Sequence, residues 1–161
     1  MASRLPAFPR FVFTVFEPIS LIAGFVPAMF MPDWFISAQN VSPSPLIDTD
    51  NARLVAQQLG NCYGLLALIG LAVLNTSTEL AVVRNYLIAL WVADITHVAA
   101  TCYAIGYGRS VSVGEWDAML WGNVGVTVLL FLTRTAYLLG LFGPDAPPSY
   151  PATTEANKKL K

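Results

Sequence analysis

The feature that most constrains this chain is a set of four long apolar runs. A helix needs about 20 mostly apolar residues to cross a hydrocarbon core that is ~30 Å thick. The runs at residues 11–31, 53–74, 83–107 and 117–142 all meet that length. They predict an all-α integral membrane protein, a four-helix transmembrane bundle.

Composition excludes several other classes of protein. Only 12% of the residues are charged and 55% are hydrophobic, whereas about 25% are charged in a typical soluble domain. The net charge of -1 does not suggest the basic surface that nucleic-acid binding requires. Cys62 and Cys102 lie in apolar runs without the spacing of metal ligands, so we expect no metal site and no disulfide framework.

Residues 1–142 are therefore expected to form the transmembrane domain. Residues 143–161 are rich in proline and polar residues and are expected to form a disordered tail. Cytoplasmic flanks of membrane spans hold an excess of Lys and Arg. One side of the membrane would hold most of these residues, namely Arg4, Arg10, Arg84, Lys158, Lys159 and Lys161. The other side would hold only Arg53 and Arg109. Both termini and the second loop are thus predicted to be cytosolic.

Two short motifs bear on the compartment. The ending Lys158-Lys159-Leu160-Lys161 resembles the dilysine retrieval signal of endoplasmic reticulum membrane proteins. The alternative is an ordinary basic tail that follows the positive-inside rule. Asn40 begins a glycosylation sequon in the first loop, which is predicted to be luminal. The expected location is the endoplasmic reticulum membrane.

Ionisable residues inside the spans are the strongest candidates for a site, because a charge in hydrocarbon is costly unless it is paired or faces a polar cavity. Glu17 lies in the first span and Arg134 in the fourth. At ~1.5 Å per residue, both lie roughly 9–12 Å from the cytosolic end of the bundle. We expect them to pair. A structural ion pair is favoured over a catalytic role for Glu17.

The third span carries Asp94 and, three residues later, His97. This spacing places both side chains on one face of a helix. An aspartate beside an imidazole can hold its tautomer and provide a proton donor or acceptor sheltered from water. The alternative is a hydrogen-bonded cluster that ties helices together. We favour a functional role for this pair slightly.

Further polar and aromatic side chains cluster on two helix faces. On a 3.6-residue wheel, one narrow arc of the fourth span holds Trp116, Asn123, Thr127, Arg134 and Tyr137. One face of the second span holds Gln57, Gln58, Asn61 and Gly64. Because such groups are unsatisfied in lipid, these faces should turn inward and form a luminal chamber above the Glu17–Arg134 pair. The expected ligand contacts are Gln57, Asn61, Trp91, Trp116, Asn123, Thr127 and Tyr137. For each amide or hydroxyl, a helix–helix hydrogen bond is the alternative.

The layout resembles a known group of membrane proteins. An acid in span one, within Phe16-Glu17-Pro18-Ile19-Ser20, precedes a third span with Asp94 and His97 and a fourth span with Trp and Asn residues. This pattern resembles the EXPERA group, which includes emopamil-binding sterol isomerase and the sigma-two receptor. It also looks like small fungal four-span proteins and, more distantly, fungal membrane-bound meroterpenoid cyclases.

The resemblance implies cofactor-independent proton chemistry on a lipophilic substrate. Asp94 or Glu17 would be the acid and His97 the relay or base, with Trp91 and Trp116 stabilising a cation. The leading expectation is an isomerase or terpene cyclase that acts on an isoprenoid or sterol-like molecule. The alternatives are a non-catalytic lipid- or sterol-binding protein and a structural subunit of a membrane complex. The expected partners are a lipophilic small molecule and membrane lipid, and a homo-oligomer is compatible with the sequence.

Overall fold

The computed structural model describes residues 4–39 and 50–147 and is all-α in both ranges. Four helices are long and apolar enough to cross a membrane: Ala7–Phe30, Asp50–Thr76, Leu80–Ile105 and Ala118–Leu138. The predicted spans agree with them to within four residues at each end. The protein is thus a multi-pass membrane protein with a four-helix transmembrane bundle.

The first span contains a wide turn at a proline. It consists of α1 (Ala7–Phe11), a π-helical segment (Val12–Phe16) and α2 (Glu17–Phe30). The N–H of Glu17 donates to the carbonyl oxygen of Val12, five residues back. Because Pro18 has no N–H and its ring crowds the preceding turn, a wider turn relieves the local clash. The helix therefore continues through Pro18, and Glu17 is the first residue of α2.

The other spans are two long helices and one interrupted helix. Helix α4 (Asp50–Thr76) and helix α5 (Leu80–Ile105) are joined by a short turn. The fourth span comprises α7 (Ala118–Leu120), a second π-helical segment (Trp121–Val126) and α8 (Thr127–Leu138). Between the spans lie α3 (Pro32–Ala38), α6 (Tyr107–Val111) and the 3-10 turn Val113–Glu115.

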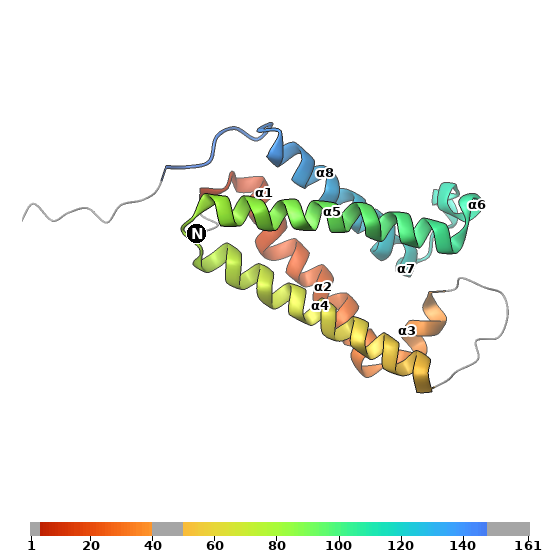
Figure 1. Cartoon of the computed structure of the whole chain (residues 1–161). Helices are drawn as coiled ribbons and strands as arrows, with labels where there is room; N and C mark the ends of the chain where they lie inside the picture. The colour runs from red at the N-terminus through yellow and green to blue at the C-terminus, as the bar shows by residue number, and fades with distance from the viewer. Residues whose placement is uncertain (1–3, 40–49, 148–161) are drawn as a thin grey trace, which may run out of the picture.

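The helices form two pairs that separate toward one end of the bundle (Figure 1). Helix α2 packs along α4, and α5 packs along α8. We call the end that holds α1 and the α4–α5 turn the terminal end, and the end that holds α3, α6 and α7 the loop end. The two pairs lie close together at the terminal end and diverge toward the loop end.

A glycine permits the close packing of α2 on α4. A Cβ atom at Gly60 would lie 3.1 Å from the Cβ atom of Ala28 and 3.1 Å from the backbone nitrogen of Met29. No larger residue fits there without moving one helix, because backbone atoms cannot turn aside as a side chain can. Gly60 thus sets the distance between the two helices of this pair.

The main core lies at the terminal end, where the two pairs meet. Phe13, Leu74, Leu87 and Tyr137 are among its buried side chains. The start of the predicted tail, residues 143–147, lies against this end of the bundle. There Asp145 accepts hydrogen bonds from Arg84 at 3.0 Å and from Tyr137 at 3.1 Å. Asn40, the rest of the tail and its terminal lysines lie outside the described residues.

Candidate functional site

Arg134, on α8, is the centre of a buried charge cluster. Its side chain is 0% exposed. Nη2 donates to Oε1 of Glu17, and Nη1 donates to Oδ2 of Asp94 at 2.5 Å. Both carboxylates are almost completely buried. The pair that depth along the spans predicts is therefore present, and Asp94 is a second partner of the same guanidinium.

The cluster joins the two helix pairs, because Glu17 belongs to α2, Asp94 to α5 and Arg134 to α8. The Phe13 ring lies 5.3 Å from Arg134 Cζ and adds a cation–π contact. Among the described residues, Arg134 Nε has no hydrogen-bond partner. When all three groups are ionised, two carboxylates face one guanidinium, which leaves one negative charge in excess.

His97 lies apart from this cluster. In the described part of the chain, no hydrogen bond connects Asp94 to His97, and the Asp94 carboxylate contacts Arg134 instead. The His97 ring is half-buried and lies against the backbone of Asn123. Asp94 therefore does not orient the imidazole in this structure.

A pocket of about 270 Å³ lies at the loop end, between α5, the end of α3 and the start of the fourth span. Most of its lining is apolar, and its polar groups include the amides of Gln39 and Asn123, which are hydrogen-bonded at 3.0 Å. It is lined by Gln39, Ala100, Thr101, Ala104, Ile105, Met119, Leu120 and Asn123. Ala100 and Ala104 are exposed, so the pocket opens to the surroundings of the bundle.

Of Asp94 and His97, the two candidate site residues on α5, His97 lies nearer to this pocket along the helix. It precedes Thr101 by four residues, and residues at this spacing are stacked on one face of a helix. The imidazole therefore lies one helical turn deeper than the Thr101 wall of the pocket. Glu17 and Asp94 are absent from the lining.

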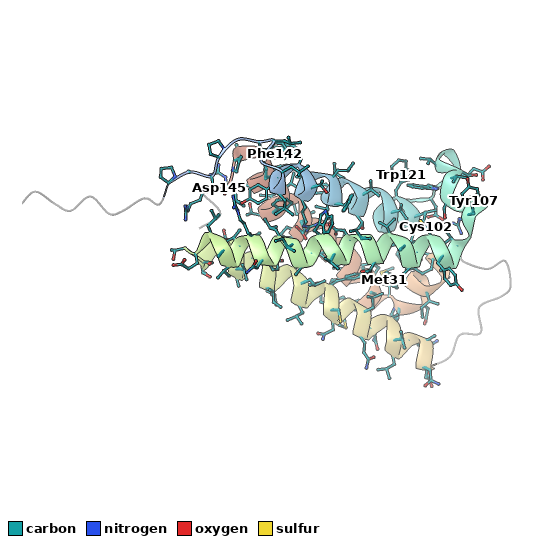
Figure 2. The ribbon with its side chains drawn as sticks, turned by 45° about the horizontal axis from the view of Figure 1, so that its top comes forward. Met31, Cys102, Tyr107, Trp121, Phe142 and Asp145 are labelled. Atoms are coloured by element: carbon teal, nitrogen blue, oxygen red, sulfur yellow. The ribbon has the colours of Figure 1, made fainter. Side chains whose placement is uncertain are left out.

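The aromatic residues that the sequence places in one chamber lie at different levels of the bundle. Trp91 stacks on Phe131 and donates to Thr135 Oγ1 at 2.9 Å. Trp116 donates to the carbonyl oxygen of Arg109 at 3.1 Å and packs edge-on against Trp121. Figure 2 shows Trp121 at the loop end, whereas Asp145, the partner of Tyr137, lies at the terminal end. These rings do not line a common cavity.

The polar residues are also dispersed. Asn123 lines the pocket, and Thr127 is half-buried one turn further along the fourth span. Gln57 is exposed on α4 and donates to the carbonyl oxygen of Met29 at 3.3 Å. Asn61 is exposed on α4. Of the seven expected ligand contacts, only Asn123 therefore lines the pocket.

The second π-helical segment changes which way the residues of the fourth span face. Trp121–Val126 lies between Trp116 and Arg134, and a π-helical turn contains more residues than an α-helical one. The side chains before this segment are therefore rotated about the helix axis relative to the side chains after it. A wheel of constant 3.6 residues per turn cannot represent this span, and the arc that it predicts is split.

Gln39 is a polar pocket residue that sequence reasoning missed. It follows α3, a seven-residue helix in the first loop, and nothing in its neighbourhood points to a site. Its contact with Asn123 spans 84 positions of the chain. Only a signal that links distant positions would have found it, because neither hydropathy nor helical periodicity relates a loop residue to a membrane span.

Comparison with known proteins yields a family and no described relative. Residues 2–144 match the family described as Domain of unknown function (DUF7704). No curated protein and no solved structure matches the chain. The match extends from the start of the chain through all four spans and ends at Pro144, within the segment that returns to the bundle. The chain therefore belongs to the DUF7704 family.

Proposed function

We propose that this protein binds a lipophilic molecule with a polar end group, of the sterol or isoprenoid type, in the loop-end pocket without converting it. The observation that carries this proposal is the separation of the pocket from the two buried acids. Glu17 and Asp94 both contact Arg134 and are absent from the pocket lining. They act as structural groups that join helices.

The size and lining of the pocket support a ligand of this class. Its volume, about 270 Å³, is slightly below the range of about 300–1,000 Å³ typical of small-molecule sites. It would hold the polar end of a lipophilic molecule while the remainder lies along exposed α5 in the lipid. The side-chain amides of Gln39 and Asn123 can each donate and accept hydrogen bonds. They would bind a hydroxyl or carbonyl group.

An isomerase or cyclase is the second candidate, and the position of His97 favours it. An imidazole one turn below the Thr101 wall could exchange a proton with a bound molecule. In such an enzyme, His97 would act instead of Glu17 and Asp94. The resemblance of the sequence layout to the EXPERA group favours the same class of ligand for both candidates.

We further propose that the protein resides in the endoplasmic reticulum membrane with both termini in the cytosol. The distribution of Lys and Arg supports this orientation. In that orientation the loop end and its pocket face the lumen.

The test uses the purified protein in lipid nanodiscs with two photoreactive probes, a diazirine-bearing sterol and a diazirine-bearing isoprenoid alcohol. We expect labelled peptides from the α5 segment that contains Thr101. The variant Asn123→Leu should bind the probe about tenfold more weakly, because it loses roughly 1.4 kcal/mol of hydrogen bonding. Asn75→Leu, the same change at the terminal end of α4, is the matched control and should bind normally.

Labelling elsewhere, or labelling that is equal in Asn123→Leu and Asn75→Leu, would contradict the proposed pocket. Mass spectrometry of the unlabelled sterol and isoprenoid alcohol after incubation separates the two candidates. Recovery of unchanged lipid supports binding alone. A product that forms with the unmodified protein and is lost in His97→Gln supports the isomerase or cyclase.

A further inference from the structure

The outer face of α4 is uncovered by the rest of the molecule. Figure 1 shows α4 at the edge of the bundle, with α2 on one side only, and in Figure 2 many of its side chains project away from the other helices. Leu54, Leu65 and Leu68 are 54%, 53% and 68% exposed. Apolar exposure alone is ordinary for a helix that faces lipid.

Two amides on this face are not ordinary. Gln58 and Asn61 are exposed, and the structure assigns neither side chain a hydrogen bond to any described residue. Asn61 is about 17 Å from the start of α4, a helix of 27 residues that is about 40 Å long. It therefore lies well inside the hydrocarbon. An amide without a hydrogen-bond partner there costs several kcal/mol.

The amides belong to a regular stripe. Its exposed positions are separated alternately by four and three residues: Leu54, Gln58, Asn61, Leu65, Leu68 and Ala72. We call this set the α4 seam. Separations of four and three are those of the contact seam of paired helices. The seam lies about 140° around the helix from the side that packs on α2, which contains Ala56 and Gly60.

We propose that the α4 seam is the interface between two copies of this chain. An amide is both a donor and an acceptor, so Asn61 can pair with Asn61 of a second copy across a two-fold axis. The seam carries no charge that would oppose such symmetry. Packing of side chains and interhelical hydrogen bonds drive helix association in lipid, and the seam offers both along about 27 Å of helix.

The proposal is independent of ligand binding, because no residue of α4 lines the loop-end pocket. A single-span partner chain could also cover the seam. A pair of identical helices is favoured because Asn61 supplies the donor and the acceptor that its own copy needs.

Single cysteines test which face of α4 meets its partner. The background carries Cys62→Ala and Cys102→Ala in the full chain, reconstituted in vesicles of phosphatidylcholine at low protein density. Leu65→Cys and Leu68→Cys place the thiol on the seam. Val55→Cys and Leu66→Cys are exposed but lie off it. Oxidation should give a cross-linked dimer for the seam positions and at least fivefold less for the other two.

A second measurement tests the amide. Energy transfer between labelled copies is followed over a range of protein-to-lipid ratios. Asn61→Leu should weaken dimerisation roughly tenfold, because two interhelical hydrogen bonds of about 0.6–1 kcal/mol each are lost. Asn85→Leu, which replaces an exposed amide on α5, should dimerise normally. A monomer at all densities, equal cross-linking on and off the seam, or an unchanged dimer in Asn61→Leu would each overturn the proposal.

Discussion

Replacing Arg134 with methionine should destabilise the protein more than any other change of a single charge. Arg134 is 0% exposed and contacts both Glu17 and Asp94. Removing one partner of a buried ion pair costs about 3–5 kcal/mol, because the other charge stays buried and unpaired. In Arg134→Met, two carboxylates lose their only described cation at once. We therefore expect a loss of at least 5 kcal/mol in the free energy of unfolding.

Because the cluster has one negative charge in excess, neutralising one of its acids should cost much less stability than removing Arg134. Glu17→Gln removes the excess negative charge and leaves Arg134 paired with Asp94, while the new amide oxygen can still accept a hydrogen bond. This variant should lose only about 1–2 kcal/mol. Asp94→Asn should behave in the same way. The double variant Arg134→Met, Glu17→Gln should have a much lower free energy of unfolding than Glu17→Gln alone, because Asp94 is then unpaired.

Equilibrium unfolding by SDS in mixed bicelles, followed by circular dichroism, measures these differences. The matched control is Arg53→Met, because Arg53 is 41% exposed and its partners Asp33 and Asp50 are 59% and 98% exposed. This variant should lose no more than about 1 kcal/mol. If Arg134→Met and Glu17→Gln lose equal stability, then Arg134 is not the group that holds the carboxylates in the membrane, and the reasoning fails.

Three further results are expected. Gly60→Val should reduce stability by about 1–3 kcal/mol because its side chain meets Ala28 and the α2 backbone, whereas Gly108→Val, with nothing within 4 Å, should be nearly neutral in the same unfolding assay. Trp91→Phe should keep the stack on the Phe131 ring, lose the hydrogen bond to Thr135, and cost about 1 kcal/mol by SDS unfolding. A protease cleavage site added at either terminus should be cut when protease is added outside sealed microsomes. Protection of either site would contradict the proposed orientation.

The length of the spans could be predicted from the sequence because lipid imposes it. Each helix must bury its backbone hydrogen bonds across the whole hydrocarbon core, so a run of apolar residues suffices to locate it. The Glu17–Arg134 pair was predictable for a related reason. Both residues lie at similar depths measured from the same end, and a buried charge requires a partner.

The second partner of Arg134 was not predictable by the same reasoning. Spacing along α5 associates Asp94 with His97, a local contact between neighbours on one face. The structure shows Asp94 bound to a cation on another helix, and an ionic hydrogen bond of this kind is stronger than a neutral one. Counting residues along straight helices also neglects their tilt and the long reach of an arginine side chain.

The predicted chamber depended on an unbroken helical period. The π-helical segment Trp121–Val126 rotates the two halves of the fourth span relative to each other. It contains no proline, unlike the first π-helical segment, which Pro18 follows closely. The same regularity in α4 led to the expectation that Asn61 faces inward. In fact Gly60 and Ala56 face α2, so Asn61 points outward.

The position of Arg134 in the last span has a consequence for how the protein is made. Glu17 precedes its partner by 117 residues. At about 5–20 residues per second, the ribosome needs roughly 6–23 s to add them. During that interval the first span carries an acid whose counterion has not yet been synthesised, and the third span does so for the last 40 residues. We therefore expect the final helix to stabilise the membrane positions of the first and third spans, because both acids can pair only after Arg134 has been added.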